Sequence, residues 1–375
     1  MSAHPMERSW DVAVVGGGLL GSAIGYGLAK RGLRAVILDE GDEAFRAARG
    51  NFGLVWVQGK GARAAPYARW TQESAALWPD LAAALEAETG TALQLEQMGG
   101  IHVCLSEEEF ETRGKAMASL AAQPGSRFDY EMLGRNALAR HLPGLGPDVV
   151  GGSWSAQDGH VDPLRLLSAL QQGFVRAGGT LRPGHRVTRV APEGSGFLLE
   201  AGTERLRAGR IVLAAGLGNA ALAPMLGLRQ PVRPQKGQVL VAERMPRFLE
   251  LPTTHIRQTG EGTVLLGDSK EEAGFDTTST PGILRQITDR ARRTFPMLAH
   301  AQIVRSWAAL RVMTPDGLPV YDRSSEHPGA FAAACHSGVT LAAAHAGHLA
   351  GMVVEGRLGG EAATLGPGRF DVQAA

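Results

Sequence analysis

Three segments of the sequence share one pattern, in which a short apolar run passes into glycine and then into a helix-like stretch. The runs and their glycines are residues 12–15 with Gly16, residues 211–213 with Gly216, and residues 330–334 with Gly338. Apolar runs of this length bounded by glycine are typical of buried strands followed by tight turns. The pattern therefore predicts an α/β fold with several strand-to-helix turns.

The first of these turns, GGGLLG, lies in a unit of strand, turn, helix and second strand. Gly16 allows the sharp turn, Gly18 lets the backbone approach a pyrophosphate, and Gly21 lets the helix pack closely on the strand. The second strand ends in Asp39, where a carboxylate accepts hydrogen bonds from a ribose hydroxyl. Because Glu40 follows in place of a cation, the unit predicts a dinucleotide without a 2′-phosphate.

Other stretches predict helices and hairpins around this unit. Asp162 is expected to cap a helix that begins at Pro163, and residues 255–258 and 264–267 are expected to form a hairpin. A helical stripe over residues 70–85 contains two tryptophans, which are expected in the core, and a proline that should kink the helix. The stretch at residues 231–243 is interpreted as a turn entering a strand.

Composition excludes several classes of protein. The 375 residues suggest roughly two domains, and 38 Lys and Arg against 37 Asp and Glu give no electrostatic footprint for nucleic acid or a membrane surface. No apolar run is long enough for a membrane span or a signal core, and Cys104 and Cys335 show no disulfide or metal-ligand spacing. We therefore expect a cytoplasmic protein without a metal site.

Six motifs, spread over nearly the whole chain in a fixed order, carry a resemblance to a known family. They are GGGLLG near the start, DGHVDP at residues 158–163, the run at residues 211–216, QKGQ at residues 235–238, SWAALR at residues 306–311 with TPDGLP, and HSGVTL at residues 336–341. The set resembles the D-amino-acid oxidase superfamily of FAD-dependent oxidoreductases. The turn that alone indicated only a dinucleotide is thereby assigned to FAD.

The resemblance implies an α/β plus α+β fold and non-covalent FAD in an extended form. A discontinuous Rossmann-like FAD-binding domain is expected over residues 1–88, 149–222 and 305–375, and an antiparallel β-sheet substrate domain over residues 89–148 and 223–304. Cys335 is interpreted as a small buried side chain rather than a flavin attachment point. The expected cofactor-binding residues are Gly16, Gly18, Leu20, Gly21, Asp39, Glu40, Arg49, Gly50, Asn51, Val187, Ala215, Gly216, Gly338, Val339, Thr340 and Leu341.

Within the superfamily, three stretches look most like the β subunits of heteromeric opine, D-hydroxyproline and hydrogen-cyanide-forming dehydrogenases. They are GNFGLVWVQGKG, HIRQTGEG and CHSGVTLAAAHA. The resemblance implies a small amino- or imino-acid substrate and partner subunits with further redox centres. One departure is Ala309, which takes the place of the glycine in the usual WxGxR motif.

Four residues are expected to act on the substrate. Arg311 is the leading candidate, since a guanidinium offers two parallel donors to a carboxylate and the motif arginine of the family has that role. His255 takes the place of a cavity-lining tyrosine of the family, Arg257 is expected on the same strand face, and His336 is expected beside the flavin ring. The alternative for each is a structural role, which for Arg311 is an ion pair on a strand.

Three functions remain open from the sequence. The first is a dehydrogenase subunit that oxidises a C–N bond and passes electrons to a partner or dye. The second is a stand-alone oxidase of the glycine or sarcosine kind that produces hydrogen peroxide. The third is a flavin-bearing subunit whose partner carries out the substrate chemistry.

Overall fold

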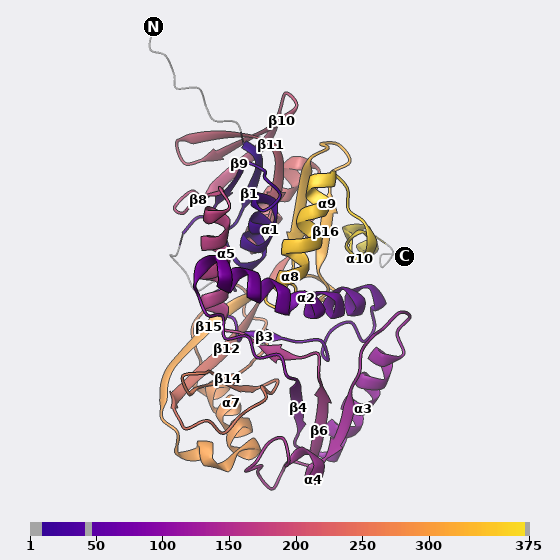
Figure 1. The fold of residues 1–375 in the computed structure, drawn as a ribbon, viewed down its shortest axis with the longest axis vertical. Coiled ribbons are helices and arrows are strands. Elements are labelled where there is room, and N and C mark those ends of the chain that lie inside the picture. The colour runs from indigo at the N-terminus through magenta and orange to yellow at the C-terminus, as the bar shows by residue number, and fades with distance from the viewer. Residues whose placement is uncertain (1–9, 42–46, 372–375) are drawn as a thin grey trace.

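The computed structural model describes residues 10–41 and 47–371. Its upper half in Figure 1 is built on a mixed sheet with the strand order β16, β17, β11, β1, β2, β8, which β10 and β9 extend from β11. Neighbouring strands from β17 to β8 run parallel. The strands are β1 (Trp10–Val15), β2 (Ala35–Leu38), β8 (Thr180–Arg182), β9 (Val187–Glu193), β10 (Gly196–Ala201), β11 (Glu204–Leu213), β16 (Val320–Arg323) and β17 (Ala330–Ala334). All three predicted apolar runs are therefore strands of one sheet.

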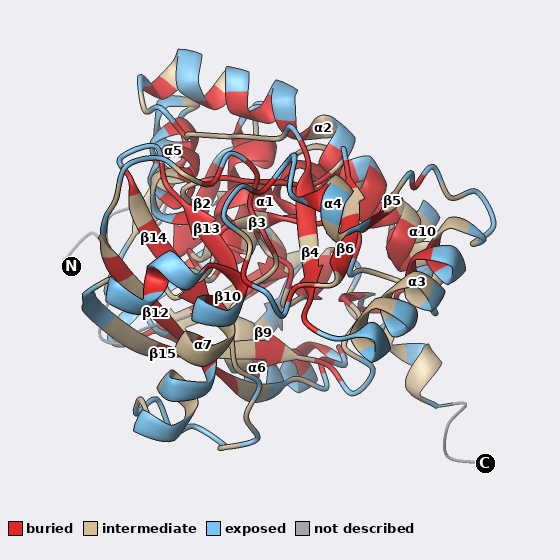
Figure 2. Cartoon of the chain, turned by 90° about the horizontal axis from the view of Figure 1, so that it is seen from below, coloured by how far each residue is buried: buried red, intermediate tan, exposed pale blue. Residues whose placement is uncertain are grey.

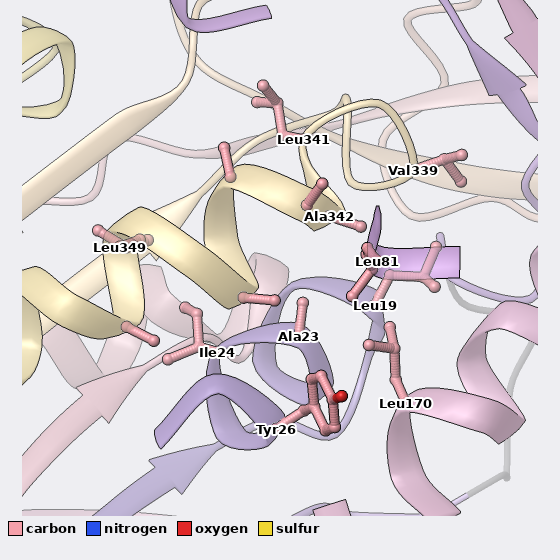
Figure 3. Packing of buried hydrophobic residues seen from close by; sticks show 14 of the residues in the cluster. Leu19, Ala23, Ile24, Tyr26, Leu81, Leu170, Val339, Leu341, Ala342 and Leu349 are labelled. Atoms are coloured by element: carbon pink, nitrogen blue, oxygen red, sulfur yellow. The ribbon is translucent and has the colours of Figure 1, made fainter. Parts of the chain in front are cut away.

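Helices cover this sheet and bury its central strands. On one side α1 packs against α5 and against the helical segment near the C-terminus (Figure 3). The long helix α2 crosses the middle of the molecule in Figure 1 and contacts α5 and α8. These helices are α1 (Leu19–Ala29), α2 (Ala65–Thr89), α5 (Pro163–Arg176), α6 (Asn219–Leu222), α8 (Ala342–Ala344), α9 (Ala350–Glu355) and α10 (Gly360–Thr364), with a π-helical turn at His345–Leu349 between α8 and α9.

The lower half contains two antiparallel sheets. One has the order β13, β14, β12, β15 and the other the order β4, β6, β5. Their strands are β4 (Gly100–Cys104), β5 (Glu131–Gly134), β6 (Gly151–Ser155), β12 (Arg233–Arg244), β13 (Ile256–Gln258), β14 (Thr263–Gly267) and β15 (Ile303–Met313), while β3 (Leu54–Val55) pairs with β7 (Gly159–His160). The helices are α3 (Glu107–Ala121), α4 (Arg135–Leu138) and α7 (Pro281–Thr294).

The two antiparallel sheets share one hydrophobic core. Ile101 and Val103 of β4 pack in the same buried cluster as Leu240 of β12 and Phe295 after α7. Strands β4 and β6 are mostly buried, whereas α3 and α7 show exposed outer faces (Figure 2). The antiparallel sheets are therefore held together by apolar burial, separately from the cores around the mixed sheet.

Several local predictions are confirmed. Asp162 caps α5, where its carboxylate accepts hydrogen bonds from the backbone N–H groups of Leu164 and Arg165, and the predicted hairpin is formed by β13 and β14. Trp70 and Trp78 lie in the core. The predicted α/β plus α+β fold, with a Rossmann-like sheet and separate antiparallel sheets, is confirmed.

Other predictions need correction. The segment from Gln235 to Gln238 is not a turn but part of β12, because β15 supplies an antiparallel partner along its whole length. Pro79 lies inside the continuous helix α2, with the buried Trp78 and Leu81 packed into the core on either side of it, and the kink at Pro79 stays a prediction. Two sequence-based domain boundaries cut across sheets, since β6 pairs with β4 and β5, and β15 pairs with β12. The antiparallel sheets therefore include residues 151–155 (β6) and residues 303–313 (β15).

Among the described residues, no helix is both long and apolar enough to cross a membrane.

Candidate active site

The first glycine turn is fixed by direct contact with the neighbouring strand end. Gly16 has a φ of +106°, and a Cβ there would lie 2.4 Å from the carbonyl oxygen of Ala214. A Cβ on Gly21 would lie 1.9 Å from the carbonyl oxygen of Gly16. Only glycine fits at these two positions, so the turn, the first strand and α1 have a single close-packed arrangement.

The same turn leaves room where a pyrophosphate is expected. Among the described residues, the Cβ of Ala48, at 3.7 Å, is the only atom found within 4 Å of a Cβ built on Gly18. Gly18 is the N-cap of α1, and the first N–H groups of a helix have no partner inside the helix and favour an anion. Asp39 is held by N–H groups of Gly17 at 2.7 Å and Gly41 at 2.9 Å, and its carboxylate has further lone pairs for a ribose.

The second glycine turn lies against the first. The Cα of Ala215 lies 2.9 Å from the position of a Cβ on Gly16, and Gly216 adopts a φ of +58°. Asn219 accepts a hydrogen bond from the N–H of Ala215 at 2.8 Å and donates to the carbonyl oxygen of Ala333 at 3.0 Å. One buried side chain thus ties the second turn to the strand that leads into the third.

Other expected nucleotide contacts lie around this turn. Leu20 is half-buried at the start of α1, and Val187 is buried at the start of β9. Glu40 lies 3.4 Å from the guanidinium of Arg186. The backbone around Val187 is close to Asp39, whose carbonyl oxygen accepts a hydrogen bond from the N–H of His185 at 2.7 Å.

The third turn precedes the C-terminal helical segment and is anchored through Thr340. The hydroxyl of Thr340 accepts from the N–H of Trp56 at 3.1 Å, and its carbonyl oxygen accepts from Ser74 at 2.7 Å and Trp78 at 3.1 Å. Leu341 belongs to the same buried cluster as Leu19 and Ile24 of α1 (Figure 3).

The backbone of this third turn remains available to a ligand. The N–H groups of Gly338, Val339 and Thr340 donate to no other described residue. Free backbone donors beside a cavity fit the pyrimidine edge of a flavin, where negative charge develops on reduction. Together with the open space at Gly18, this supports the prediction that the chain holds an extended FAD.

The segment before β3 lies beside the same site. A Cβ on Gly50 would lie 2.2 Å from the Cβ of Ala309, and the indole N–H of Trp307 donates to the carbonyl oxygen of Gly50 at 3.3 Å. Asn51 accepts a hydrogen bond from the N–H of Gly53 at 2.7 Å, while Arg49 is exposed. The alanine in place of the family glycine is therefore packed directly against Gly50.

A cavity of about 630 Å³ lies between these turns and the antiparallel sheets. Its wall includes parts of both halves of the molecule. The polar residues that line it are Asn51, Lys60, His102, Arg113, Gln235, Thr254, His255, Asp268, Lys270, Arg311, His336, Ser337 and Thr340.

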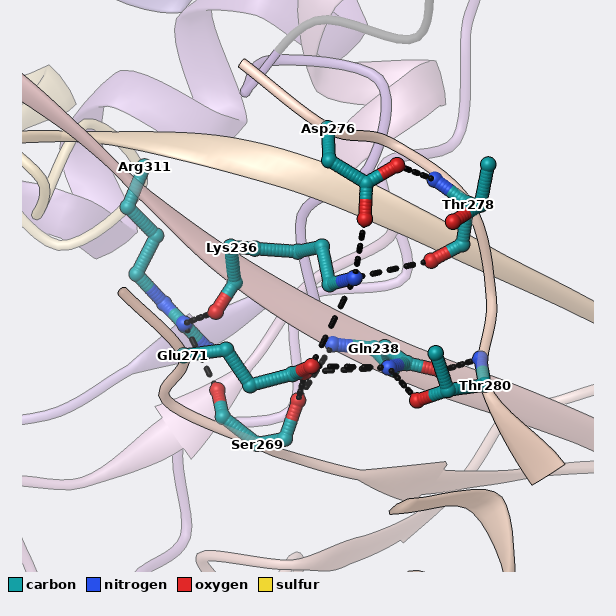
Figure 4. Close-up of polar contacts among 8 residues, drawn as sticks. All are labelled: Lys236, Gln238, Ser269, Glu271, Asp276, Thr278, Thr280 and Arg311. Carbon is teal, nitrogen blue, oxygen red and sulfur yellow. Dashed lines mark hydrogen bonds and ion pairs between the residues drawn. The ribbon is translucent and has the colours of Figure 1, made fainter. Parts of the chain in front are cut away.

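Arg311 enters this cavity from β15 and is held in place by the chain after β14. It donates a hydrogen bond to the carbonyl oxygen of Ser269 at 2.8 Å and forms an ion pair with Asp268. Figure 4 shows the segment from Ser269 to Thr280 tied to β12 through Lys236 and Gln238. The position of the guanidinium is thus fixed, and the carboxylate that it pairs with belongs to the protein itself.

Lys60, which was not among the residues expected from the sequence, lies beside His336 in the cavity. The Nζ of Lys60 lies 3.0 Å from the Nε2 of His336. Burial holds the pKa of His336 well below its usual range, and burial, assisted by the charge of Lys270, lowers the pKa of Lys60 to about 8. The neutral imidazole therefore accepts a hydrogen bond from the Nζ of Lys60, which can donate both as an ammonium group and as a neutral amine.

The structure separates the two candidates on the hairpin. His255 lines the cavity, with its ring centroid 5.8 Å from that of His102. Arg257 is buried beside Gly53, and its Nη1 lies 3.3 Å from the Nδ1 of His160. Of the two, only His255 lines the cavity. The predicted shared strand face fails because β13 begins at Ile256, so His255 lies outside the strand and does not follow its two-residue alternation of side chains.

Besides Lys60, four further polar residues line the cavity that were not expected from the sequence, namely His102, Arg113, Asp268 and Lys270. Lys60 lies inside the quoted run GNFGLVWVQGKG, so a signal for it was present. The others come from β4, α3 and the loop after β14, and no local pattern connects them.

Three comparisons with known proteins point to one family. The family model of FAD dependent oxidoreductases, DAO, matches residues 11–352. An opine oxidase subunit of Rhizobium meliloti is 42% identical over 366 residues, which cover 97% of this chain and 99% of that protein. Hydrogen cyanide synthase subunit HcnC of Pseudomonas aeruginosa is 30% identical, with 88% of each chain covered. The glycine oxidase structure from Geobacillus kaustophilus has a TM-score of 0.86 at 27% identity, covering 94% of this chain and 96% of that one.

Proposed function

We propose, from the premise that this chain belongs to the DAO family of FAD-dependent oxidoreductases, that it oxidises the C–N bond of an opine or a D-hydroxyproline-like imino acid. The observation that carries the proposal is the placement of Arg311 in a cavity that also contains the free N–H groups of the third glycine turn. That arrangement provides a carboxylate-binding group next to the expected flavin position.

FAD, when bound, supplies the hydride acceptor, so the protein has to orient the substrate and manage its protons. Arg311 binds the substrate carboxylate, which replaces part of its contact with Asp268. Lys60 takes up the proton of the substrate ammonium at its Nζ, since a pKa of about 8 leaves this amine neutral above that pH. We therefore assign binding to Arg311, proton acceptance to Lys60, and positioning of Lys60 to His336.

We further propose that electrons leave through partner subunits. The support for this is the name of the similar opine oxidase chain, which denotes one subunit of several. The similarity to glycine oxidase favours the second candidate, a stand-alone oxidase that passes electrons to oxygen.

Anaerobic mixing with a panel of opines, proline derivatives and D- and L-amino acids tests the proposal. We expect opines or hydroxyproline-like compounds to bleach the flavin absorbance of the isolated chain. Bleaching by none of them, with or without partner subunits, would leave only a non-catalytic flavin-bearing role. After bleaching, hydrogen peroxide formed as fast as an added dye is reduced would favour the stand-alone oxidase, and dye reduction without peroxide would favour a subunit of a complex.

A further inference from the structure

The candidate cavity contains a second arginine, Arg113, whose guanidinium is only partly used by the protein. Its Nε donates to the hydroxyl of Ser153 at 2.7 Å, and its Nη2 donates to Gln58 at the carbonyl oxygen, 2.8 Å away, and at Oε1, 2.5 Å away. Its Nη1 donates to no described residue, although Arg113 lines the cavity. One edge of the guanidinium thus fixes the side chain, and one amino group is left for a ligand.

No carboxylate of the described residues is hydrogen-bonded to Arg113. The effect of burial on the pKa of Arg113 is partly opposed by the charge of the buried Asp158, but the carboxyl group of Asp158 is hydrogen-bonded to the N–H groups of Val57 and Gln58 instead. Other arginines nearby are paired: Arg311 with Asp268, and Arg290 with Glu109 at 3.0 Å. Placing a half-buried cation in a cavity without a paired anion is unfavourable unless a ligand supplies that anion. Burial lowers the pKa of Arg113 only to about 10, so it stays charged at neutral pH.

Arg113 and Arg311 reach the cavity from different elements. Arg113 extends from α3 and is held by the hydroxyl of Ser153 on β6, whereas Arg311 extends from β15 and is held by the carbonyl oxygen of Ser269. The side chains of Thr254 and His102, hydrogen-bonded at 2.9 Å, add further polar groups to the same cavity. Two guanidinium groups from different elements therefore line one cavity, and each can receive an anion.

We propose that Arg113 determines specificity by binding a second carboxylate of the substrate through Nη1, while Arg311 binds the first. The inference rests on the proposed function, because it assumes that the molecule oxidised in this cavity is an amino acid. It narrows the substrate to secondary amines that carry a carboxylate on each arm.

Two ligands that differ by one carboxylate test this role, namely iminodiacetate and N-methylglycine. We compare the FAD-loaded wild type with Arg113→Gln, which removes the charge but keeps a donor, and with Lys115→Gln, the same charge change on the exposed face of the same helix. Anaerobic calorimetry gives the Kd of each ligand, and dye reduction gives KM and kcat.

We expect Arg113→Gln to weaken iminodiacetate binding more than about tenfold, with kcat changed less than about threefold and N-methylglycine binding unchanged, a tenfold change being about 1.4 kcal/mol. Arg113→Lys should restore part of the loss, and it decides the question if the glutamine variant does not fold. Equal losses for both ligands, or no loss, would overturn the inference, as would a wild type that prefers N-methylglycine. Since calorimetry needs no turnover, a wild type that binds iminodiacetate through Arg113 but is bleached by no compound refutes only the proposed function.

Discussion

The guanidinium of Arg311 is hydrogen-bonded to Ser269 and paired with Asp268, yet its side chain stays partly exposed. Because Ser269 and Asp268 already fix the guanidinium, a substrate carboxylate meets a preformed fork. We expect Arg311→Lys to retain FAD but to weaken substrate binding by more than about tenfold, about 1.4 kcal/mol. An ammonium group cannot present two parallel donors.

Flavin absorbance titrations under anaerobic conditions, with FAD content measured in parallel, check this expectation. Arg244→Lys is the matched control, because Arg244 lies exposed on the neighbouring strand β12. Unchanged affinity in Arg311→Lys would mean that Arg311 serves only as the ion-pair partner of Asp268.

Gly50 and Ala309 are packed so closely that the side chain of Ala309 leaves no room for a Cβ at position 50. A methyl group on Gly50 would lie 2.2 Å from the Cβ of Ala309, so Gly50→Ala should cost roughly 1–3 kcal/mol of stability through overpacking. Thermal unfolding and FAD content measure the effect. The double variant with Ala309→Gly should recover both, and failure of that rescue would rule out the steric explanation.

At the scale of elements, α1 is pressed directly against the C-terminal helical segment. A Cβ on Gly27 would lie 1.9 Å from the carbonyl oxygen of Ala346 and 2.7 Å from the Cβ of Ala350. We expect Gly27→Ala to lower the free energy of unfolding by about 1–3 kcal/mol, since the overpacking exceeds the gain in helix propensity. The shifted helix should also weaken FAD binding, because the N-terminus of α1 carries the expected pyrophosphate site.

Urea denaturation gives the unfolding free energy of this variant. Gly347→Ala is its control, since Gly347 lies in the adjoining segment and a new Cβ there would meet no neighbouring atom of the described residues within 4 Å. If both variants lose the same stability, the close approach of α1 at Gly27 is not the cause.

The sequence predicts elements whose signals are local. The turns at Gly16, Gly216 and Gly338 follow from short apolar runs, and the start of α5 follows from Asp162. The cavity wall does not follow in this way. Arg113 comes from a helix packed on another sheet, and its place depends on contacts far apart in the sequence, such as the hydrogen bond to Gln58. The pattern of residues within a single helix or strand does not predict such a long-range contact.

At the scale of the whole molecule, the chain alternates between the mixed sheet and the antiparallel sheets. Strand β15 leaves the antiparallel sheet and is followed by β16 and β17 of the mixed sheet, so Arg311 and the third turn are close in sequence and share one cavity. This alternation explains why the expected domain boundaries near residues 149 and 305 separate strands that pair with each other. The strands on either side of each boundary carry similar local signals, and only their partners differ.

Asp158 is buried between the segment after β3 and strand β4, and we expect its ionisation to make the stability of the folded protein depend on pH. Its Oδ1 accepts hydrogen bonds from the N–H groups of Val57 and Gln58, its Oδ2 has no partner among the described residues, and its Cβ lies 2.8 Å from a Cβ built on Gly100 of β4. Burial, the largest effect, raises the pKa of Asp158 to about 7. An unfolded chain ionises this carboxyl near pH 3.9.

The folded protein therefore holds a proton that the unfolded chain releases between about pH 4 and 7, and stability should fall as the pH rises through this window. Asp158→Asn keeps the acceptor for Val57 and Gln58 without a charge, so its stability should not show this fall. Urea denaturation of both proteins from pH 4.5 to 8 gives the comparison, with the exposed Asp129→Asn as control. The wild type should lose stability relative to Asp158→Asn up to about pH 7 and then run parallel to it. Curves that stay parallel over the whole range would show that Asp158 ionises at its ordinary pKa in the folded protein.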